Sequence, residues 1–256
     1  MRQLPTAYLE LDPEYAVRSY FKDPEWMFKT GMGGIFNAVA LVLAGMMVQS
    51  QWWLPVAMVV SAVVNGYLLR VAKKRQEDPR ENLPDWNGWG ELLFGGLTWM
   101  AVQFSWHVMA AIPITIALII GIVSISAYAN SVPTVALLMA ILMVVVLLVG
   151  LGTHFLLSYL MLNFGRTERL SAGFNFGKVI IYAIRYPRQM ITAWILSFEL
   201  QLFAVLLPAM TVVGVALIPS TLFAAQLVSV TIMAQVWNSA EASAASARAQ
   251  VEKKAG

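Results

Sequence analysis

Three long stretches of this chain are nearly free of charged side chains, and each is longer than one membrane crossing requires. Their bounds are Lys29 and Arg70, Glu91 and Arg166, and Arg188 and Glu241, with Glu199 the single charge inside the third. A transmembrane helix needs about 20 consecutive apolar residues. Only 12% of the residues are charged, against roughly 25% in a typical soluble domain. The chain is therefore predicted to be an all-α, polytopic transmembrane helical bundle.

Proline, glycine and polar residues divide these stretches into about six spans. The predicted spans are about Thr30–Gln49, Leu54–Val71, Leu92–Tyr128, the break at Asn130–Pro133 to about Phe164, Gln189–Leu217 and Thr221–Val236. Pro113 is expected to kink the third span, because proline removes one backbone hydrogen bond. Paired tryptophans between the first two spans suit a membrane interface.

The distribution of charge predicts an orientation. The loops Ser50–Trp53, Asn130–Pro133 and Ile218–Ser220 contain no charged residue, whereas the alternate loops hold the Lys and Arg side chains. Because positive charge marks the cytoplasmic side, both termini are predicted to be cytoplasmic. We expect a prokaryotic inner membrane or another energy-transducing membrane. The expected organisation is a cytoplasmic segment with an interfacial amphipathic stretch (1–29), one transmembrane domain (30–238) and an Ala/Ser-rich cytoplasmic tail (239–256).

The sequence lacks the motifs that are typical of several classes of chemistry. The chain has no cysteine, which excludes disulfides and thiolate ligands or nucleophiles. It has no Gly-rich phosphate loop, nucleophile elbow or HExxH motif. No basic stripe with interleaved aromatics suggests nucleic-acid binding. We therefore expect no enzyme activity, no metal site and no nucleic-acid partner.

Three ionisable side chains fall inside the predicted spans: His107, His154 and Glu199. Such residues are functional candidates because charge in hydrocarbon is costly. Glu199 and His154 lie about 15 Å and 16 Å from the same membrane face at the helical rise per residue. We expect Glu199 to face the protein interior, with His154 as its first candidate partner. Simple packing, proton or ion coupling, and pigment or haem ligation by His107 or His154 all remain open.

A basic, apolar segment precedes the fifth span. Between Ser171 and Arg188, aromatic and branched residues alternate with Lys178 and Arg185. This pattern predicts a short helix in the cytoplasmic interface. Lys178, Arg185 and Arg188 are expected to hold anionic lipid headgroups, although an ordinary amphipathic connector has the same pattern.

Two motifs carry a family resemblance. They are Asn65-Gly66-Tyr67-Leu68-Leu69-Arg70-Val71 and Leu83-Pro84-Asp85-Trp86-Asn87-Gly88-Trp89-Gly90-Glu91. The sequence resembles the domain-of-unknown-function family 4013 of bacterial and archaeal integral membrane proteins, over about residues 15–238. That family has no established activity, so the resemblance implies an architecture and no mechanism.

The second motif also has a physical interpretation of its own. Leu83 and Pro84 would set a turn, Asp85 could cap the next helix, and Trp86 and Trp89 would share a face at the interface. This predicts a structural bend that fixes the second span against the third. A docking surface for a partner is the alternative.

These features favour a non-enzymatic accessory or scaffold subunit, or an assembly factor, of a larger membrane complex. The alternative is a small transporter or lipid-handling protein that uses Glu199 and the basic segment Lys178–Arg188. Membrane lipids, and other membrane-protein subunits, are the expected partners.

The orientation predicts which introduced cysteines an impermeant thiol reagent reaches in intact cells. Because the chain has no cysteine of its own, each new thiol reports one position. Cysteines replacing Gln51, Ser131 or Ser220 should be labelled from outside. Those replacing Glu77 or Ser243 should be labelled only after permeabilisation, and labelling of position 77 in intact cells contradicts the topology.

Overall fold

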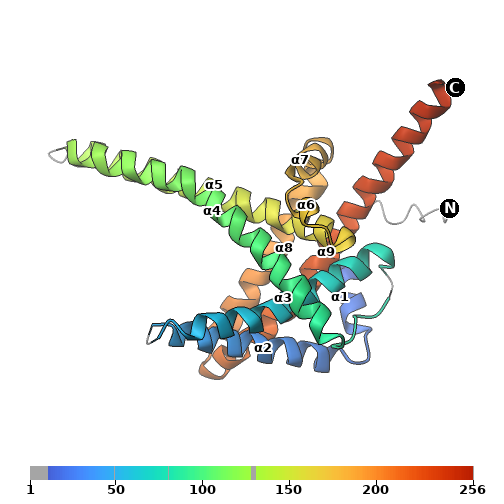
Figure 1. Ribbon diagram of the computed structural model, residues 1–256. Helices are drawn as coiled ribbons and strands as arrows, with labels where there is room; N and C mark the ends of the chain where they lie inside the picture. Colours follow the sequence, from blue (N-terminus) through green and yellow to red (C-terminus); the bar gives the residue numbers. More distant parts are fainter. Residues whose placement is uncertain (1–10, 49, 80, 128–130, 256) are drawn as a thin grey trace. The chain divides into compact units, whose positions relative to one another are not determined.

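The computed structural model describes residues 11–48, 50–79, 81–127 and 131–255, and the regular secondary structure of these residues is entirely helical (Figure 1). In chain order the helices are α1 (Pro13–Phe21), α2 (Trp26–Met46), α3 (Trp53–Glu77), α4 (Trp89–Ala127), α5 (Val132–Thr167), α6 (Leu170–Gly173), α7 (Phe176–Arg185), α8 (Pro187–Ala209) and α9 (Val212–Ala255). The chain divides into two compact units, Met1–Met100 with Tyr159–Gly256, and Ala101–Ser158.

Six helices of the described residues are long and apolar enough to cross a membrane: α2, α3, α4, α5, α8 and the Val212–Ser246 part of α9. This confirms the all-α polytopic architecture and the number of spans. The predicted short helix of the basic segment is also present as α7, whose first turn is capped by the Asn175 side chain accepting from the Lys178 N–H.

The turn between the fifth and sixth spans differs from the prediction. It lies at Met210 and Thr211, not at Ile218–Ser220. The Thr211 hydroxyl accepts from the Gly214 N–H at 2.9 Å and so caps α9. Pro219 lies inside α9, because membrane helices tolerate proline where neighbouring groups satisfy the backbone. The position for external thiol labelling therefore moves from Ser220 to the exposed Thr211.

Helix α9 also continues past the last span. Residues 239–255 are helical and Ala240 is only 2% exposed, so the predicted separate tail is an extension of the same helix. At the other end, α2 begins at Trp26, a turn earlier than the predicted span. Both differences arise because charged residues bound a hydrophobic stretch without ending its helix.

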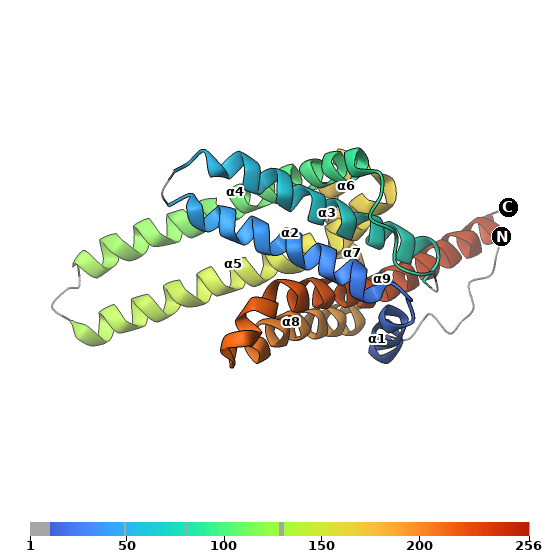
Figure 2. The same cartoon turned by 90° about the horizontal axis from the view of Figure 1, so that it is seen from below.

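Helix α9 is the centre of the larger unit. It packs against α8, α2, α3 and α1, and its side chains Phe223, Leu227 and Trp237 are fully buried. Helices α8 and α9 lie side by side, as do α2 and α3, in both views (Figures 1 and 2). The Ser229 hydroxyl donates to the Ser197 carbonyl at 3.2 Å. Small polar residues of this kind let membrane helices approach closely.

Two glycines bring α3 and the start of α4 together. A Cβ atom on Gly96 would lie 1.7 Å from the Ala62 carbonyl oxygen, and one on Gly66 would lie 1.9 Å from that of Leu92. No larger residue fits at either position without moving backbone. The two helices therefore cross in direct backbone contact, as small residues allow in membrane proteins.

The smaller unit, Ala101–Ser158, consists of the second part of α4 and the first part of α5, which form a hairpin (Figure 2). Within it Gly121 lies against the Leu142 side chain. Pro113 lies inside α4. The predicted end of this span at Tyr128 lies outside the described residues.

The glycine contact predicts a sharp difference between two neighbouring substitutions. Gly96→Ala should destabilise the protein by about 1–3 kcal/mol, because the new methyl group overlaps the Ala62 carbonyl. Gly95→Ala should be neutral or slightly stabilising, because a Cβ there meets nothing within 4 Å. Thermal unfolding in one detergent measures both, and equal melting temperatures would contradict the contact.

Candidate functional site

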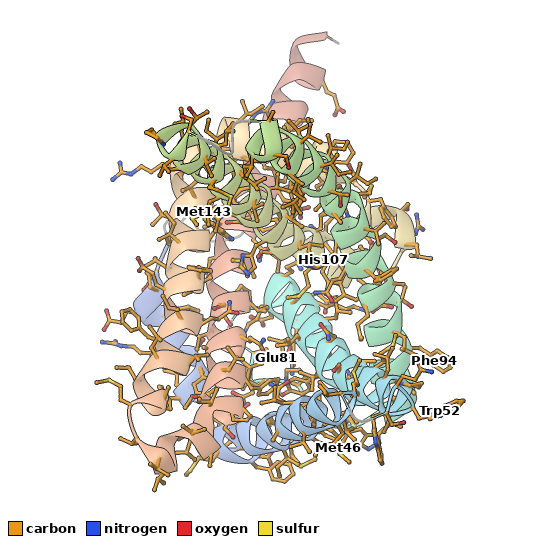
Figure 3. The ribbon with its side chains drawn as sticks, turned by 90° about the vertical axis from the view of Figure 1, so that its left-hand side faces the viewer. Met46, Trp52, Glu81, Phe94, His107 and Met143 are labelled. Carbon is orange, nitrogen blue, oxygen red and sulfur yellow. The ribbon has the colours of Figure 1, made fainter. Side chains whose placement is uncertain are left out.

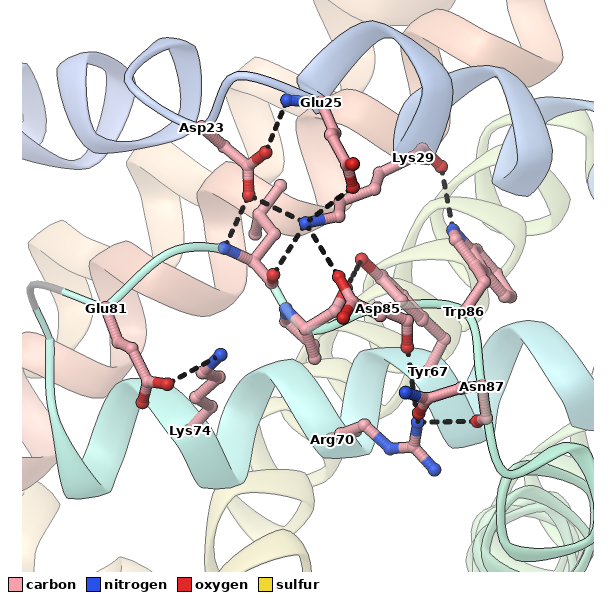
Figure 4. A network of polar contacts seen from close by, with 12 residues as sticks. Asp23, Glu25, Lys29, Tyr67, Arg70, Lys74, Glu81, Asp85, Trp86 and Asn87 are labelled. Carbon is pink, nitrogen blue, oxygen red and sulfur yellow. Dashed lines mark hydrogen bonds and ion pairs between the residues drawn. The ribbon is translucent and has the colours of Figure 1, made fainter.

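A polar cluster with a buried ion pair at its centre surrounds Lys29, in the first turn of α2. The Lys29 residue is 4% exposed and Asp23 is 0% exposed. The Lys29 Nζ atom donates to Asp23 Oδ2 at 3.0 Å and to the Leu83 carbonyl at 2.9 Å. Asp85 Oδ1 lies 3.3 Å from the Lys29 Nζ atom, and Glu25 Oε2 lies 3.6 Å from the same atom (Figure 4). An ammonium group has three donors, so this one is saturated.

Asp23 is satisfied from both sides. Its Oδ1 atom accepts from the Glu25 N–H at 2.7 Å, which closes the turn between α1 and α2. Its Oδ2 atom accepts from the Leu83 N–H at 2.8 Å as well as from Lys29. We call this group of Asp23, Lys29, Leu83 and Asp85 the Lys29 clasp. It joins the α1–α2 turn to the loop between α3 and α4.

The same loop is fixed from α3 by aromatic contacts. The Tyr67 hydroxyl donates to the Pro84 carbonyl at 2.7 Å, and its ring stacks on Trp86 at 3.9 Å. The Trp86 Nε1 atom donates to the Lys29 carbonyl at 3.1 Å. Trp86 is buried, whereas Trp89 is exposed. These contacts hold the loop as a bend against α3, but Trp86 lies before α4 and is buried, so Trp86 and Trp89 do not share the interfacial face that the sequence predicted.

Asp85 has a different role from the one predicted. Helix α4 begins at Trp89, and the Gly88 carbonyl accepts its first hydrogen bond, from Leu92. Asp85 lies too far before this start to cap it, and its carboxylate pairs with Lys29 instead. Gly88 has a φ of +60°, a conformation that favours glycine, and this sets the sharp turn into α4.

Two arginines of α3 hold the loop by its backbone carbonyls. Arg70 Nη1 donates to the Asn87 carbonyl at 2.7 Å and to the Asp85 carbonyl at 3.2 Å. The buried Arg75 donates through Nη1 to the carbonyls of Pro79 and Glu81, at 2.7 Å and 2.8 Å. A planar guanidinium suits such forked contacts. Each arginine therefore satisfies loop carbonyls that have no partner within a helix.

Tyr20, near the end of α1, links α1 to α2. Its hydroxyl shares a hydrogen bond with the Thr30 hydroxyl. Burial raises the pKa of Tyr20, and the hydrogen bond with Thr30 acts in the opposite direction. Since burial disfavours the phenolate, the side chain stays neutral and serves as a fixed polar contact between α1 and α2.

A second ionic cluster surrounds Glu241 of α9. Glu241 pairs with Arg166 at the end of α5 and with Lys178 Nζ of α7, the latter at 2.5 Å. Lys178 also donates to Asn163 Oδ1 at 3.0 Å and lies 5.0 Å from the centre of the Trp237 ring. Its charge is thus neutralised within the protein, which leaves Lys178 little available for the lipid headgroup that the sequence predicted.

Arg185 and Arg188 differ from Lys178. Both are exposed, and among the described residues neither has a hydrogen bond or ion pair. Helix α7 presents exposed Phe176, Ile180 and Ile184 on one face, while Val179 and Tyr182 are buried. The amphipathic character predicted for this segment is therefore confirmed.

The polar candidates inside the spans lie on exposed positions. The His107 Nδ1 atom bonds to the Gln103 carbonyl of its own helix at 2.7 Å. At His154, the backbone carbonyl accepts a hydrogen bond from the Ser158 hydroxyl one turn later. The described residues contain no group of three or more His, Cys, Asp or Glu that could hold a metal ion.

The expectation that Glu199 faces the protein interior is wrong. Ser197 of α8 is buried against Ser229 of α9, and residue 199 lies about 200° further around a helix with 3.6 residues per turn. Glu199 is accordingly exposed and has no hydrogen bond or ion pair with the described residues of its own unit. The depth of a residue along a span can be counted from the sequence, but the side of the helix that faces the other helices cannot be found by counting.

Sequence reasoning missed Asp23, Lys29, Arg75 and Glu241. Lys29 and Glu241 served only as charged bounds of apolar stretches. One signal was present for the first pair, since Asp23-Pro24-Glu25 is a turn sequence in which Asp commonly bonds the backbone two residues on. For Arg75 and Glu241, whose partners come from distant helices or loops, the sequence offered no signal.

The family of proteins of unknown function DUF4013 matches residues 52–218. The chain belongs to this family. The DUF4013 match contains the Leu83–Trp89 motif and both loop-holding arginines, and it confirms the resemblance seen in the sequence. No curated protein and no solved structure matches the chain.

The clasp predicts a stability defect for loss of its cation. Lys29→Met should destabilise the protein by about 3–5 kcal/mol, because Asp23 is left as a buried charge without its cation. Lys22→Met is the matched control, since Lys22 is exposed and its loss should change stability by less than about 0.5 kcal/mol.

Thermal unfolding in detergent compares Lys29→Met and Asp23→Asn with the double variant Lys29→Met/Asp23→Asn, and Lys22→Met is the control. The double variant should be more stable than the sum of the single effects, because no unpaired charge remains. Additive effects would show that Lys29 and Asp23 do not interact.

Proposed function

We propose that the protein is a non-enzymatic accessory or scaffold subunit of a larger membrane complex, and that the hairpin Ala101–Ser158 contacts an apolar transmembrane segment of another protein. The main support for this proposal is the length of α4 and α5, the two helices that form the hairpin. Helix α4 has 39 residues and α5 has 36. Their only charged residues, Glu91 and Arg166, lie in the first turn of α4 and the last turn of α5.

These helices exceed what a bilayer covers. At the helical rise per residue, α4 is about 58 Å long and α5 about 54 Å, against a hydrocarbon core of roughly 30 Å. At a tilt of about 40°, the upper end of the usual range, α5 still extends about 41 Å along the membrane normal. Pro113 allows α4 to bend, but α5 has no such proline beyond its first turn. A protein partner would cover the apolar surface that remains.

The larger unit supports a structural role in a different way. The buried cations Lys29 and Arg75, and the half-buried Lys178, are engaged with carboxylates or backbone carbonyls. Groups held in this way fix the arrangement of helices and loops.

One observation favours a second candidate, a small transporter or lipid-handling protein. The exposed apolar face of α7, with Arg185 and Arg188 beside it, suits a helix in the membrane interface. Arginines at such a position attract anionic headgroups. Glu199 lacks an interior partner in its unit, so this candidate rests on α7.

Photo-crosslinking in native membranes tests the first proposal. A photoreactive residue replacing Val123, Leu137 or Met143, all exposed in the hairpin, should give one discrete adduct with a second protein. The same residue at the exposed Leu41 of α2 is the control and should not give that adduct.

Three other results would contradict the scaffold proposal. Lipid adducts alone at every position would favour the lipid-handling candidate. An adduct between two differently tagged copies would show self-association in place of a partner. The same protein adduct at Leu41 and in the hairpin would remove the special role of the hairpin.

A further inference from the structure

A cleft of about 500 Å³ opens in the larger unit between α3, the start of α4 and the end of α5. Cavities that hold small ligands usually measure about 300–1,000 Å³. Arg70, Lys73, Glu91 and Glu168 line one part of it, and apolar residues that include Phe94 and Phe164 line the rest. The cleft is therefore amphipathic and has room for a ligand.

The four charged side chains form two ion pairs. Arg70 Nη2 lies 3.2 Å from Glu91 Oε2, and Lys73 Nζ lies 2.7 Å from Glu168 Oε1. The two carboxylates are largely exposed and Lys73 is half-exposed. Exposed pairs of this kind contribute about 0–1 kcal/mol. A ligand with both charges could therefore exchange partners with them at little cost, whereas a purely anionic ligand would leave two carboxylates facing it.

The charged part is held in place by the fold. Arg70 is anchored through Nη1 to the loop carbonyls, which leaves Nη2 for the cleft side. Glu168 has a φ of 54°, a left-handed conformation that is uncommon outside glycine. This residue ends α5 and lies where its carboxylate meets Lys73. Such strain persists where the surrounding structure fixes a residue, and it is frequent at ligand sites.

Polarity changes in one direction along the cleft. Arg70, Lys73 and Glu91 lie where the charge-free runs of α3 and α4 end, and Gly95 and Thr98 lie one and two turns further into the α4 run. Phe94 is 71% exposed and projects from α4 (Figure 3). A membrane-embedded cleft with this gradient presents charge at the headgroup level and apolar surface at the level of acyl chains.

We propose that this cleft binds a zwitterionic phospholipid with a primary ammonium headgroup, that is, a phosphatidylethanolamine. The phosphate accepts from Arg70 and Lys73, the ammonium donates to Glu91 and Glu168, and one acyl chain lies along Phe94 and Gly95. A quaternary choline headgroup has no N–H to donate to the carboxylates, and a glycerol headgroup has no positive charge. The site is thus selective by charge and by hydrogen bonding. It is independent of any partner of the Ala101–Ser158 hairpin.

Two glycines of α4 provide matched variants. Gly95 lines the cleft and a Cβ there meets nothing within 4 Å, so Gly95→Leu adds apolar volume to the site and keeps its four charged residues. Gly90 has equally open surroundings but is not among the residues that line the cleft. Gly90→Leu therefore controls for the added side chain. Glu91→Gln/Glu168→Gln removes the two negative charges that pair with the ammonium and keeps both cations.

Native mass spectrometry of the full-length protein in mild detergent measures the binding. The probes are phosphatidylethanolamine, phosphatidylcholine and phosphatidylglycerol with identical acyl chains. The Kd for phosphatidylethanolamine should be about tenfold lower, or more, than the Kd for either of the other two lipids. Gly95→Leu should abolish that preference, Gly90→Leu should keep it, and the double Gln variant should bind all three lipids within about twofold.

Three results would overturn the proposal. They are equal binding of the three lipids by the unaltered protein, strongest binding of phosphatidylglycerol, and an unchanged preference in Gly95→Leu. Melting temperature in detergent without lipid shows whether each variant is folded. If Gly95→Leu does not fold, the double Gln variant decides, and an unchanged preference there rejects the site.

Discussion

The ion pair between Lys29 and Asp23 bonds to Leu83 and Asp85, and so joins the start of α2 to the distant loop between α3 and α4. A lysine in the first turn of an apolar span has a large desolvation cost unless its donors are satisfied. Here the ammonium is shared between the α1–α2 turn and the loop that carries Leu83 and Asp85. Because Asp23 also accepts from two backbone N–H groups, the clasp sets the position of this loop relative to α2.

The position of the loop in turn decides how α3 meets α4. Tyr67 and Arg70 of α3 bond to the carbonyls of Pro84 and Asn87, which lie directly before α4. The close approach of Gly66 and Gly96 needs α4 to start at this point. The cleft lies beside the same crossing, so its charged part, Arg70 and Glu91, depends on the loop contacts too. One buried cation therefore supports the geometry of a site formed by other residues.

The spans could be predicted from sequence because length and hydropathy are properties of the chain in one dimension. The turn at Thr211 could not, since a single hydroxyl caps α9 within an apolar run while Pro219 continues the helix. Glu199 shows the same limit in another form: its depth follows from counting, but its exposure depends on Ser197 facing α9. Lys29 and Glu241 look alike in sequence as charged bounds, and only tertiary contacts show that each neutralises partners far along the chain.

Positive charge in this chain consequently has two physical roles that a net charge of +3 does not separate. Lys29, Arg75 and Lys178 satisfy carboxylates or carbonyls within the protein, and they offer little to a lipid surface. Arg185 and Arg188 are exposed beside the apolar face of α7, where they remain available to anionic headgroups. The cleft, with its balanced pairs, lies between these cases: it is close to neutral as a whole, and its two carboxylates are largely exposed, whereas Lys73 is half-exposed and Arg70 is mostly buried. The role of each basic side chain therefore follows from whether a carboxylate or a carbonyl of the same unit pairs with it.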